Sequence, residues 1–113
     1  FRSIKFDKTH FYQVITNILQ NAIDASEPDK AIDIRLYKEL SYAVLSIKDL
    51  GKGIDSKDLP RIFEPYFSKK SKGTGLGLAL VKRLCEANGA IIRVKSKPAE
   101  GSEFTLIMED VEK

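Results

Sequence analysis

Gly73-Thr74-Gly75-Leu76-Gly77-Leu78 is the stretch on which the interpretation of this chain depends, because three glycines alternate with larger residues directly before a helical pattern. Glycine allows the backbone to approach a bound group closely and to adopt positive φ. A helix that begins here offers free N–H groups and the positive end of its dipole to a phosphate. The stretch therefore predicts a phosphate-binding loop, although alternating glycines alone are equally typical of an ordinary loop.

Two familiar phosphate loops do not fit this stretch. A P-loop ends in Gly-Lys-Ser/Thr, and no such triplet follows Gly77. A dinucleotide fingerprint needs a strand directly before it, whereas residues 69–72 are Lys-Lys-Ser-Lys. Flexible lysines at this place, Lys70 among them, would close over a triphosphate as point charges. A solvated charged loop is the alternative interpretation of these lysines.

The composition is that of a single ordinary globular domain. The chain has 113 residues, of which 42% are hydrophobic and 31% charged, so it can bury one core. A net charge of +3 is mild for a protein that binds nucleic acid through a dense basic face. The single Cys85 forms no internal disulfide, which favours a reducing compartment. Because the chain starts at Phe1 without a Met, we expect it to be a fragment of a longer protein.

Periodicity predicts antiparallel strands with helices packed on one face, which is a two-layer α/β sandwich. Alternating apolar residues predict strands at residues 2–6, 31–38, 42–48, 90–96 and 102–108. We expect the strand at 31–38 to be half-buried. Helical spacing predicts a long helix that ends near Ser26, a short helix near residues 58–63 and a helix at 77–88 that Gly89 ends.

Asp7 is the predicted N-cap of the long helix, and Phe6 and Phe11 are placed to form a hydrophobic staple around it. His10 lies in the first turn without an adjacent carboxylate, and we interpret it as a surface residue.

The long helix carries a polar face that differs from a usual solvated one. Surface helices favour Lys and Glu, and Asn is a poor helix former. Asn17 and Asn21 are one turn apart and therefore point the same way. Amide oxygens suit a hard cation such as Mg²⁺, so this face is a candidate metal site, with a solvated surface as the alternative. The face consists of Gln13, Asn17, Gln20, Asn21 and Asp24.

Asp49-x-Gly51-x-Gly53 follows the predicted strand at 42–48. An ionised carboxylate accepts hydrogen bonds only, so Asp49 suits an exocyclic amine such as that of adenine. The glycines allow a flat ring to lie against the backbone. A calcium loop is disfavoured because Gly51 and Gly53 stand where ligands would be needed, whereas a plain Asx/Gly turn remains open.

Five stretches in sequence order resemble the motifs of one family, the sensor histidine kinases. Residues 17–22 resemble the N box, 49–54 the G1 box, 62–67 the F box, 73–78 the G2 box and 100–104 the last glycine box. The match spans residues 7–107. It implies a catalytic and ATP-binding domain of the GHKL superfamily, which includes type II topoisomerase ATPase subunits, Hsp90-type chaperones and mismatch-repair ATPases. The implied Bergerat fold has a mixed, mostly antiparallel sheet of about five strands and three helices on one face.

The resemblance also implies roles for individual residues. Asn21 would bind the Mg²⁺ that bridges the phosphates, and Asn17 would stand where related ATPases keep a catalytic Glu. Asp49 would accept a hydrogen bond from the adenine amino group, with support from Ser102. Gly51, Gly53 and Ile54 would form the adenine pocket. The remaining nucleotide contacts would come from Lys70, Gly73, Thr74, Gly75, Leu76, Gly77 and Leu78.

The phospho-acceptor of the family is missing from this sequence. In the family it lies on a dimerising helical hairpin, often as His followed by an acidic residue, whereas His10 is followed by Phe11. Many members also have Lys where this chain has Asp24. The resemblance thus implies that residues 1–113 are one catalytic domain of a longer kinase, with the accepting His elsewhere.

The partners implied by the resemblance are the dimerisation and phospho-acceptor hairpin and a response-regulator receiver domain, with no nucleic acid. The domain itself would be monomeric and the full kinase homodimeric. The domain would be cytoplasmic, in a parent protein that is soluble or attached to the inner face of the membrane. Two alternatives stay open: a regulatory module without catalysis, and a serine kinase of the anti-sigma type with the same fold.

Overall fold

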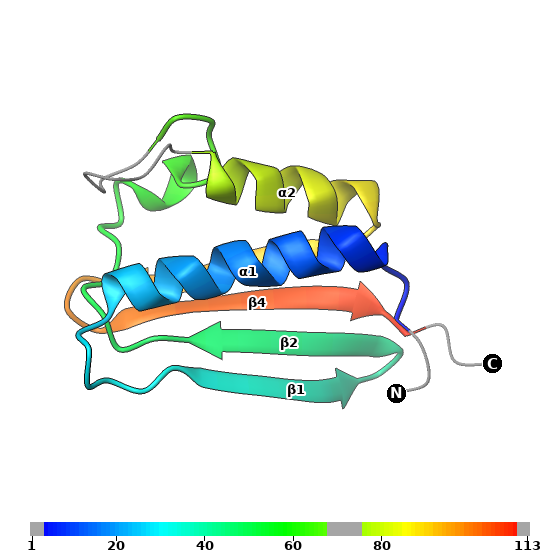
Figure 1. Cartoon of the computed structure of the whole chain (residues 1–113), viewed down its shortest axis with the longest axis horizontal. Coiled ribbons are helices and arrows are strands. Elements are labelled where there is room, and N and C mark those ends of the chain that lie inside the picture. The colour runs from blue at the N-terminus through cyan, green and yellow to red at the C-terminus, as the bar shows by residue number, and fades with distance from the viewer. Residues whose placement is uncertain (1–3, 68–75, 111–113) are drawn as a thin grey trace.

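The computed structural model describes residues 4–67 and 76–110 as a two-layer α/β sandwich, in which both α-helices cover one face of a sheet (Figure 1). The sheet is antiparallel throughout, and its strand order is β1-β2-β4-β3. The predicted fold class is confirmed. The elements are α1 (Lys8–Ala25), β1 (Asp33–Glu39), β2 (Tyr42–Lys48), a 3₁₀ turn η1 (Leu59–Arg61), α2 (Gly77–Ala87), β3 (Ile91–Lys97) and β4 (Gly101–Glu109).

The numbers of strands and helices differ from the prediction. Four strands are present within the described ranges instead of about five. Of the region predicted as a strand at 2–6, the described residues 4–6 contribute a single bridge, which joins Ile4 to Asp110 directly after β4. The third helix is only the 3₁₀ turn η1, which carries Pro60 in its first turn.

The hydrophobic core lies between the two helices and the inner face of the sheet. In β2, Ala43 and Ile47 are buried and pair across the strands with Met108 and Phe104 of β4. From α1, the buried residues are Val14, Ile18 and Ala22. Cys85 of α2 is also buried, and this burial raises the pKa of its thiol to about 11. The thiol therefore stays protonated at neutral pH and serves the core as a small apolar group.

Strand β1 does not have the predicted half-buried pattern, since all seven of its residues are exposed. The helices pack against the other three strands, α1 against β2 and β4 and α2 against β3. Ile34 and Leu36, which alternate with polar residues, consequently remain 54% and 53% exposed. The alternation predicted the strand correctly, but burial depended on where the helices lie.

The start of α1 agrees with the sequence. The Oδ1 atom of Asp7 accepts a hydrogen bond of 2.9 Å from the backbone N–H of His10, and this bond holds the pKa of Asp7 below its usual value. The rings of Phe6 and Phe11 meet edge to face, with centroids 5.6 Å apart, as the staple requires. Both predicted features are confirmed.

Asn88, directly after α2, links the two helices at this end of the molecule. Its Oδ1 accepts a 2.7 Å hydrogen bond from the backbone N–H of Asp7, and its Nδ2 donates to the carbonyl of Leu84 at 2.7 Å. The same Nδ2 lies 3.1 Å from Nδ1 of His10. One side chain thus satisfies groups at the start of α1 and the end of α2.

We expect Asn88→Ala to lower the free energy of unfolding by about 2 kcal/mol, because it removes several side-chain hydrogen bonds, including the one that the backbone N–H of Asp7 donates. Urea denaturation followed by circular dichroism measures this loss. Glu86→Ala, an exposed change on the same helix, is the matched control and should stay within about 0.5 kcal/mol of wild type. Equal stability of both variants would show that Asn88 does not hold the helices together.

Candidate functional site

The motif residues lie near one end of the sheet, where α1 and β2 end and where the chain turns from β3 into β4, at the left of Figure 1. Asp49 follows β2 directly and is only 3% exposed. Gly51 lies against the last residue of α1, Ala25, and Gly53 lies against Lys97 at the end of β3. Segments distant in sequence therefore meet in the loop at residues 49–54.

The carboxylate of Asp49 is held through one of its two oxygens. Its Oδ1 accepts hydrogen bonds from the backbone N–H of Gly51 at 2.9 Å and of Ser102 at 3.2 Å. The backbone N–H of Asp49 in turn donates to the carbonyl of Ser102 at 2.9 Å. Since both bonds that the described residues make to this side chain use Oδ1, the lone pairs of Oδ2 are left to accept from another donor.

Three glycines around Asp49 allow backbone segments to pack closely. A Cβ atom on Gly51 would overlap the carbonyl oxygen of Ala25, and one on Gly53 would overlap that of Lys97. A Cβ on Gly101, at φ +85°, would overlap the carbonyl oxygen of Asp49 itself. The need for glycine at these positions is thus explained by contacts within the protein, even before a ligand is considered.

Ser96, in β3, is a residue of this network that the sequence did not predict. Its Oγ accepts a 2.7 Å hydrogen bond from the backbone N–H of Ile54, lies 2.8 Å from Oγ of Ser102 and donates to the carbonyl of Gly101 at 2.9 Å. The sequence indicated Ser96 only as a polar residue at one of the alternating strand positions that are otherwise apolar. Finding its partners requires the register that pairs Ser96 with Ser102.

Ser102 and Ile54, both predicted as site residues, also have partners within the protein. Ser102 supports Asp49 through its backbone N–H, whereas its hydroxyl bonds to Ser96. The side chain of Ile54 packs against the hydrophobic core, as does that of Leu78. These two apolar residues therefore have a structural function in addition to any contact with a ligand.

The amide residues of α1 lie beside the start of α2. Asn17 donates from Nδ2 to the carbonyl of Gln13 at 2.9 Å, and its Oδ1 lies 3.0 Å from the position of a Cβ on Gly77. The N box and the G2 box are thus in contact. Asn17 and Asn21 are half-buried, whereas Gln20 is exposed and bonds to Asp24. The half-burial of the two Asn residues favours a site over a simple solvated face.

The N-terminus of α2 begins within the G2 box, at Gly77. Leu76 precedes the helix and makes no side-chain capping bond, and it is 42% exposed. The first N–H groups of a helix have no partners inside the helix, so the start of α2 offers donors to a bound group. The predicted contacts at Lys70, Gly73, Thr74 and Gly75 lie outside the described residues.

The F box packs next to the site through aromatic contacts. Phe63 meets Phe104 of β4 edge to face, with ring centroids 6.5 Å apart. The guanidinium of Arg61 lies 4.6 Å from the ring centroid of Phe67 and also pairs with Glu64 at 3.5 Å. These contacts anchor the segment that leads to residue 68.

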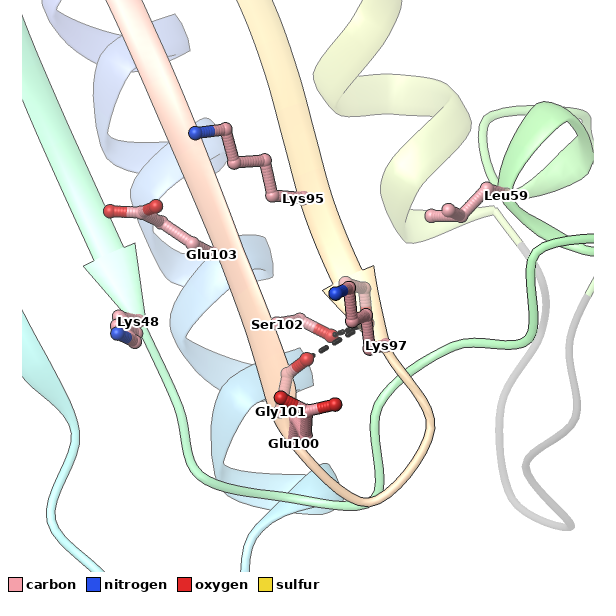
Figure 2. Close-up of a pocket in the computed structure, with 9 residues that line it drawn as sticks. Lys48, Leu59, Lys95, Lys97, Glu100, Gly101, Ser102 and Glu103 are labelled. Carbon is pink, nitrogen blue, oxygen red and sulfur yellow. Dashed lines mark hydrogen bonds between the residues drawn. The ribbon is translucent and has the colours of Figure 1, made fainter.

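A hollow of about 450 Å³ borders the Asp49 network at the β3–β4 turn (Figure 2). Glu103 pairs across the strands with Lys48 on one side and Lys95 on the other. It accepts a 2.6 Å hydrogen bond from Ser46. Ser96, Gly101 and Ser102 line the hollow too, so it adjoins the candidate site.

A metal ion at this site would need ligands other than a protein carboxylate cluster. Within residues 4–67 and 76–110, no three His, Cys, Asp or Glu side chains come together as a metal site. Mg²⁺ prefers oxygen ligands and often takes most of them from water and substrate phosphates. The amide oxygens of Asn17 and Asn21 fit that coordination.

Comparison with known proteins identifies the family. A profile described as histidine kinase-, DNA gyrase B- and HSP90-like ATPase matches residues 6–112. The chain belongs to this ATPase family. Within it, the chain is a catalytic ATP-binding domain of the histidine kinase type, so the resemblance seen in the sequence is confirmed.

Sensor kinases are among the similar curated proteins. Sensor histidine kinase ZraS of Escherichia coli (strain K12) is 40% identical over 103 residues, which are 91% of this chain and 22% of ZraS. AtoS of the same strain, a signal transduction histidine-protein kinase, is 42% identical over 106 residues, which are 93% of this chain and 17% of AtoS. This ATPase domain thus spans about a fifth of the length of these relatives.

Solved structures of sensor kinases have the same fold. The mycobacterial sensor histidine kinase MprB superposes with a TM-score of 0.83 at 30% identity, covering 91% of this chain and 72% of MprB. The catalytic domain of the histidine kinase ThkA gives a TM-score of 0.83 at 29% identity, covering 93% of this chain and 69% of that solved chain.

Proposed function

We propose that this ATPase domain binds ATP together with Mg²⁺ and positions the γ-phosphate for transfer to a histidine on a separate dimerisation domain. The observation that carries the proposal is the buried carboxylate of Asp49. Its Oδ1 is saturated by two backbone N–H groups, so Oδ2 is oriented by the protein and remains an acceptor. An acceptor fixed in this way selects a ligand with an amino group, such as adenine.

The phosphates would lie between α1 and the start of α2. The first N–H groups of α2, which follow Leu76, would donate to phosphate oxygens, helped by the helix dipole. Asn21 would hold the metal and Asn17 would orient the reacting group from one turn earlier. When bound, Mg²⁺ neutralises charge on the phosphates. Lys70, Gly73, Thr74 and Gly75 would complete these contacts.

The whole kinase would act through domains beyond this one. The acceptor histidine would be supplied by a dimerisation hairpin, and a response-regulator receiver domain would take the phosphoryl group from it. The parent kinase would be a homodimer, and this domain would be monomeric and cytoplasmic. Neither described helix has the length and apolar character that a membrane crossing requires.

Titration calorimetry with a non-hydrolysable ATP analogue tests nucleotide binding directly. We expect the analogue to bind about tenfold more tightly with Mg²⁺ than with EDTA, because the metal neutralises negative charge on the phosphates. Absence of binding in both conditions would refute the proposal. Binding that is equal in both conditions would refute the role of the metal.

We expect Asn21→Ala to weaken Mg²⁺-dependent binding of the analogue by about tenfold, as loss of a group that holds a metal usually does. Binding in EDTA should change by less than about twofold. Thr16→Ala, an exposed change on the same helix outside the polar face, is the control and should bind like wild type in both conditions. A loss of equal size with and without Mg²⁺ would contradict a metal-binding role for Asn21.

A further inference from the structure

We propose that Ser96 is a positioning residue that makes the site selective for a 6-amino purine, acting through Asp49. The inference rests on the proposed function, because it concerns the same nucleotide site. Ser96 itself does not need to touch the nucleotide. It fixes the two segments between which Asp49 is held.

The hydroxyl of Ser96 is fully used by the protein. It accepts from the backbone N–H of Ile54 and donates to the carbonyl of Gly101. Because its single proton goes to Gly101, the 2.8 Å contact with Ser102 is a bond that the hydroxyl of Ser102 donates. A hydroxyl has one donor and two acceptor positions, so all three are occupied.

These bonds reach Asp49 from both directions. Ser102, which bonds to Ser96, makes two hydrogen bonds to Asp49 through its backbone. Its N–H donates to Oδ1 of Asp49, and its carbonyl accepts from the backbone N–H of Asp49. Gly101, which accepts from Ser96, is packed against the carbonyl of Asp49. Ile54 ends the loop that begins at Asp49. Through these bonds Ser96 holds both the start and the end of this loop against β3 and β4.

A second contact holds the same loop against the β3–β4 turn without involving Ser96. The backbone N–H of Ala99 donates to the carbonyl of Lys52 at 2.7 Å. Loss of the Ser96 hydroxyl should therefore leave the orientation of the Asp49 carboxylate less fixed, while the loop stays attached to the β3–β4 turn. The strength of a hydrogen bond falls steeply as its geometry worsens, so recognition of the amino group should suffer before binding as a whole.

The test compares the ATP analogue with its inosine counterpart, which has a carbonyl in place of the amino group. A buried acceptor should reject the inosine form, and we expect the wild-type domain to prefer the ATP form by about 100-fold. Ser96→Ala should reduce this preference to about tenfold, mainly through weaker binding of the ATP form. Ser96→Thr, which keeps the hydroxyl, should retain most of the preference.

Two further variants keep the experiment decisive. Ser96→Cys nearly conserves volume but offers only a weak donor and acceptor, so its preference should fall between those of the Ala and Thr variants even if the Ala variant folds poorly. Ser46→Ala is the matched control. Ser46 is a buried serine of the same sheet, 5% exposed, whose Oγ bonds to Glu103 instead of the Asp49 network.

The outcomes separate this inference from the proposed function. If wild type fails to bind the ATP analogue, the proposed function is wrong. If wild type binds with the expected preference but the Ala and Cys variants keep it, the role of Ser96 is refuted. Equal losses for both nucleotides, or an equal effect of Ser46→Ala, would also refute it, because a general loosening of the sheet would then explain the result.

Discussion

Asp49→Asn is expected to weaken binding of an ATP analogue by about 100-fold or more while the domain remains folded. The side-chain oxygen of Asn can take the place of Oδ1 and accept from Gly51 and Ser102 as Asp49 does. Its NH₂ group then replaces Oδ2. A donor would face the donating amino group of adenine, so the attraction becomes an unsatisfied contact in a buried site.

Calorimetry measures this loss, and a thermal unfolding midpoint close to that of wild type would show that the fold is retained. Asp55→Asn is the control, since Asp55 is an exposed carboxylate of the next turn whose oxygen accepts from Lys57. It should bind the analogue normally. The Asp49→Asn variant should also bind the inosine analogue at least as well as the ATP analogue. Unchanged affinity for the ATP analogue would contradict the assignment of Asp49.

Gly101→Ala is expected to lower the free energy of unfolding by about 3 kcal/mol or more. Gly101 has φ +85°, a left-handed conformation that costs an alanine roughly 1–2 kcal/mol. The added Cβ would also overlap the carbonyl oxygen of Asp49 and approach Cα of Leu50. Because the overlapping atoms belong to the backbone, the β2 end and the loop would have to move, which adds strain.

Gly89→Ala separates these two contributions. Gly89 also has positive φ, at +68°, but a Cβ there would meet nothing within 4 Å. Only the conformational cost applies, and a loss of about 1 kcal/mol is expected. Urea denaturation of both variants gives the comparison. If the two variants lose the same free energy of unfolding, the close packing of Gly101 on Asp49 does not contribute to stability.

Local signals in the sequence predicted the two α-helices, although not the shortness of η1. The cap of α1 depends on Asp7 and His10, three residues apart, and the staple on Phe6 and Phe11. Such interactions form within one turn, so a single stretch of sequence contains all the partners. The exposure of β1 could not be predicted in this way, because it depends on which strands α1 and α2 cover.

The candidate site shows the same division between local and long-range information. The bond from Gly51 to Asp49 spans two residues, and the Asp-x-Gly pattern predicts it. The bond from Ile54 to Ser96 joins residues 42 positions apart. That partnership depends on how the β3–β4 turn meets the loop at 49–54, which no periodicity in the sequence reports. The motif therefore predicted Asp49 but not the residue that holds its surroundings.

The exposed strand β1 has a consequence for solubility. In the described part of the chain it ends the sheet, and the free edge of such a strand is a template on which other chains can aggregate. Two apolar side chains, Ile34 and Leu36, increase that hazard. Charged residues interrupt them, with Arg35 paired to Asp33 at 3.0 Å and Lys38 to Asp110 at 3.4 Å. Charge along the strand, instead of a covering helix, therefore protects this edge from forming cross-β contacts with a neighbour.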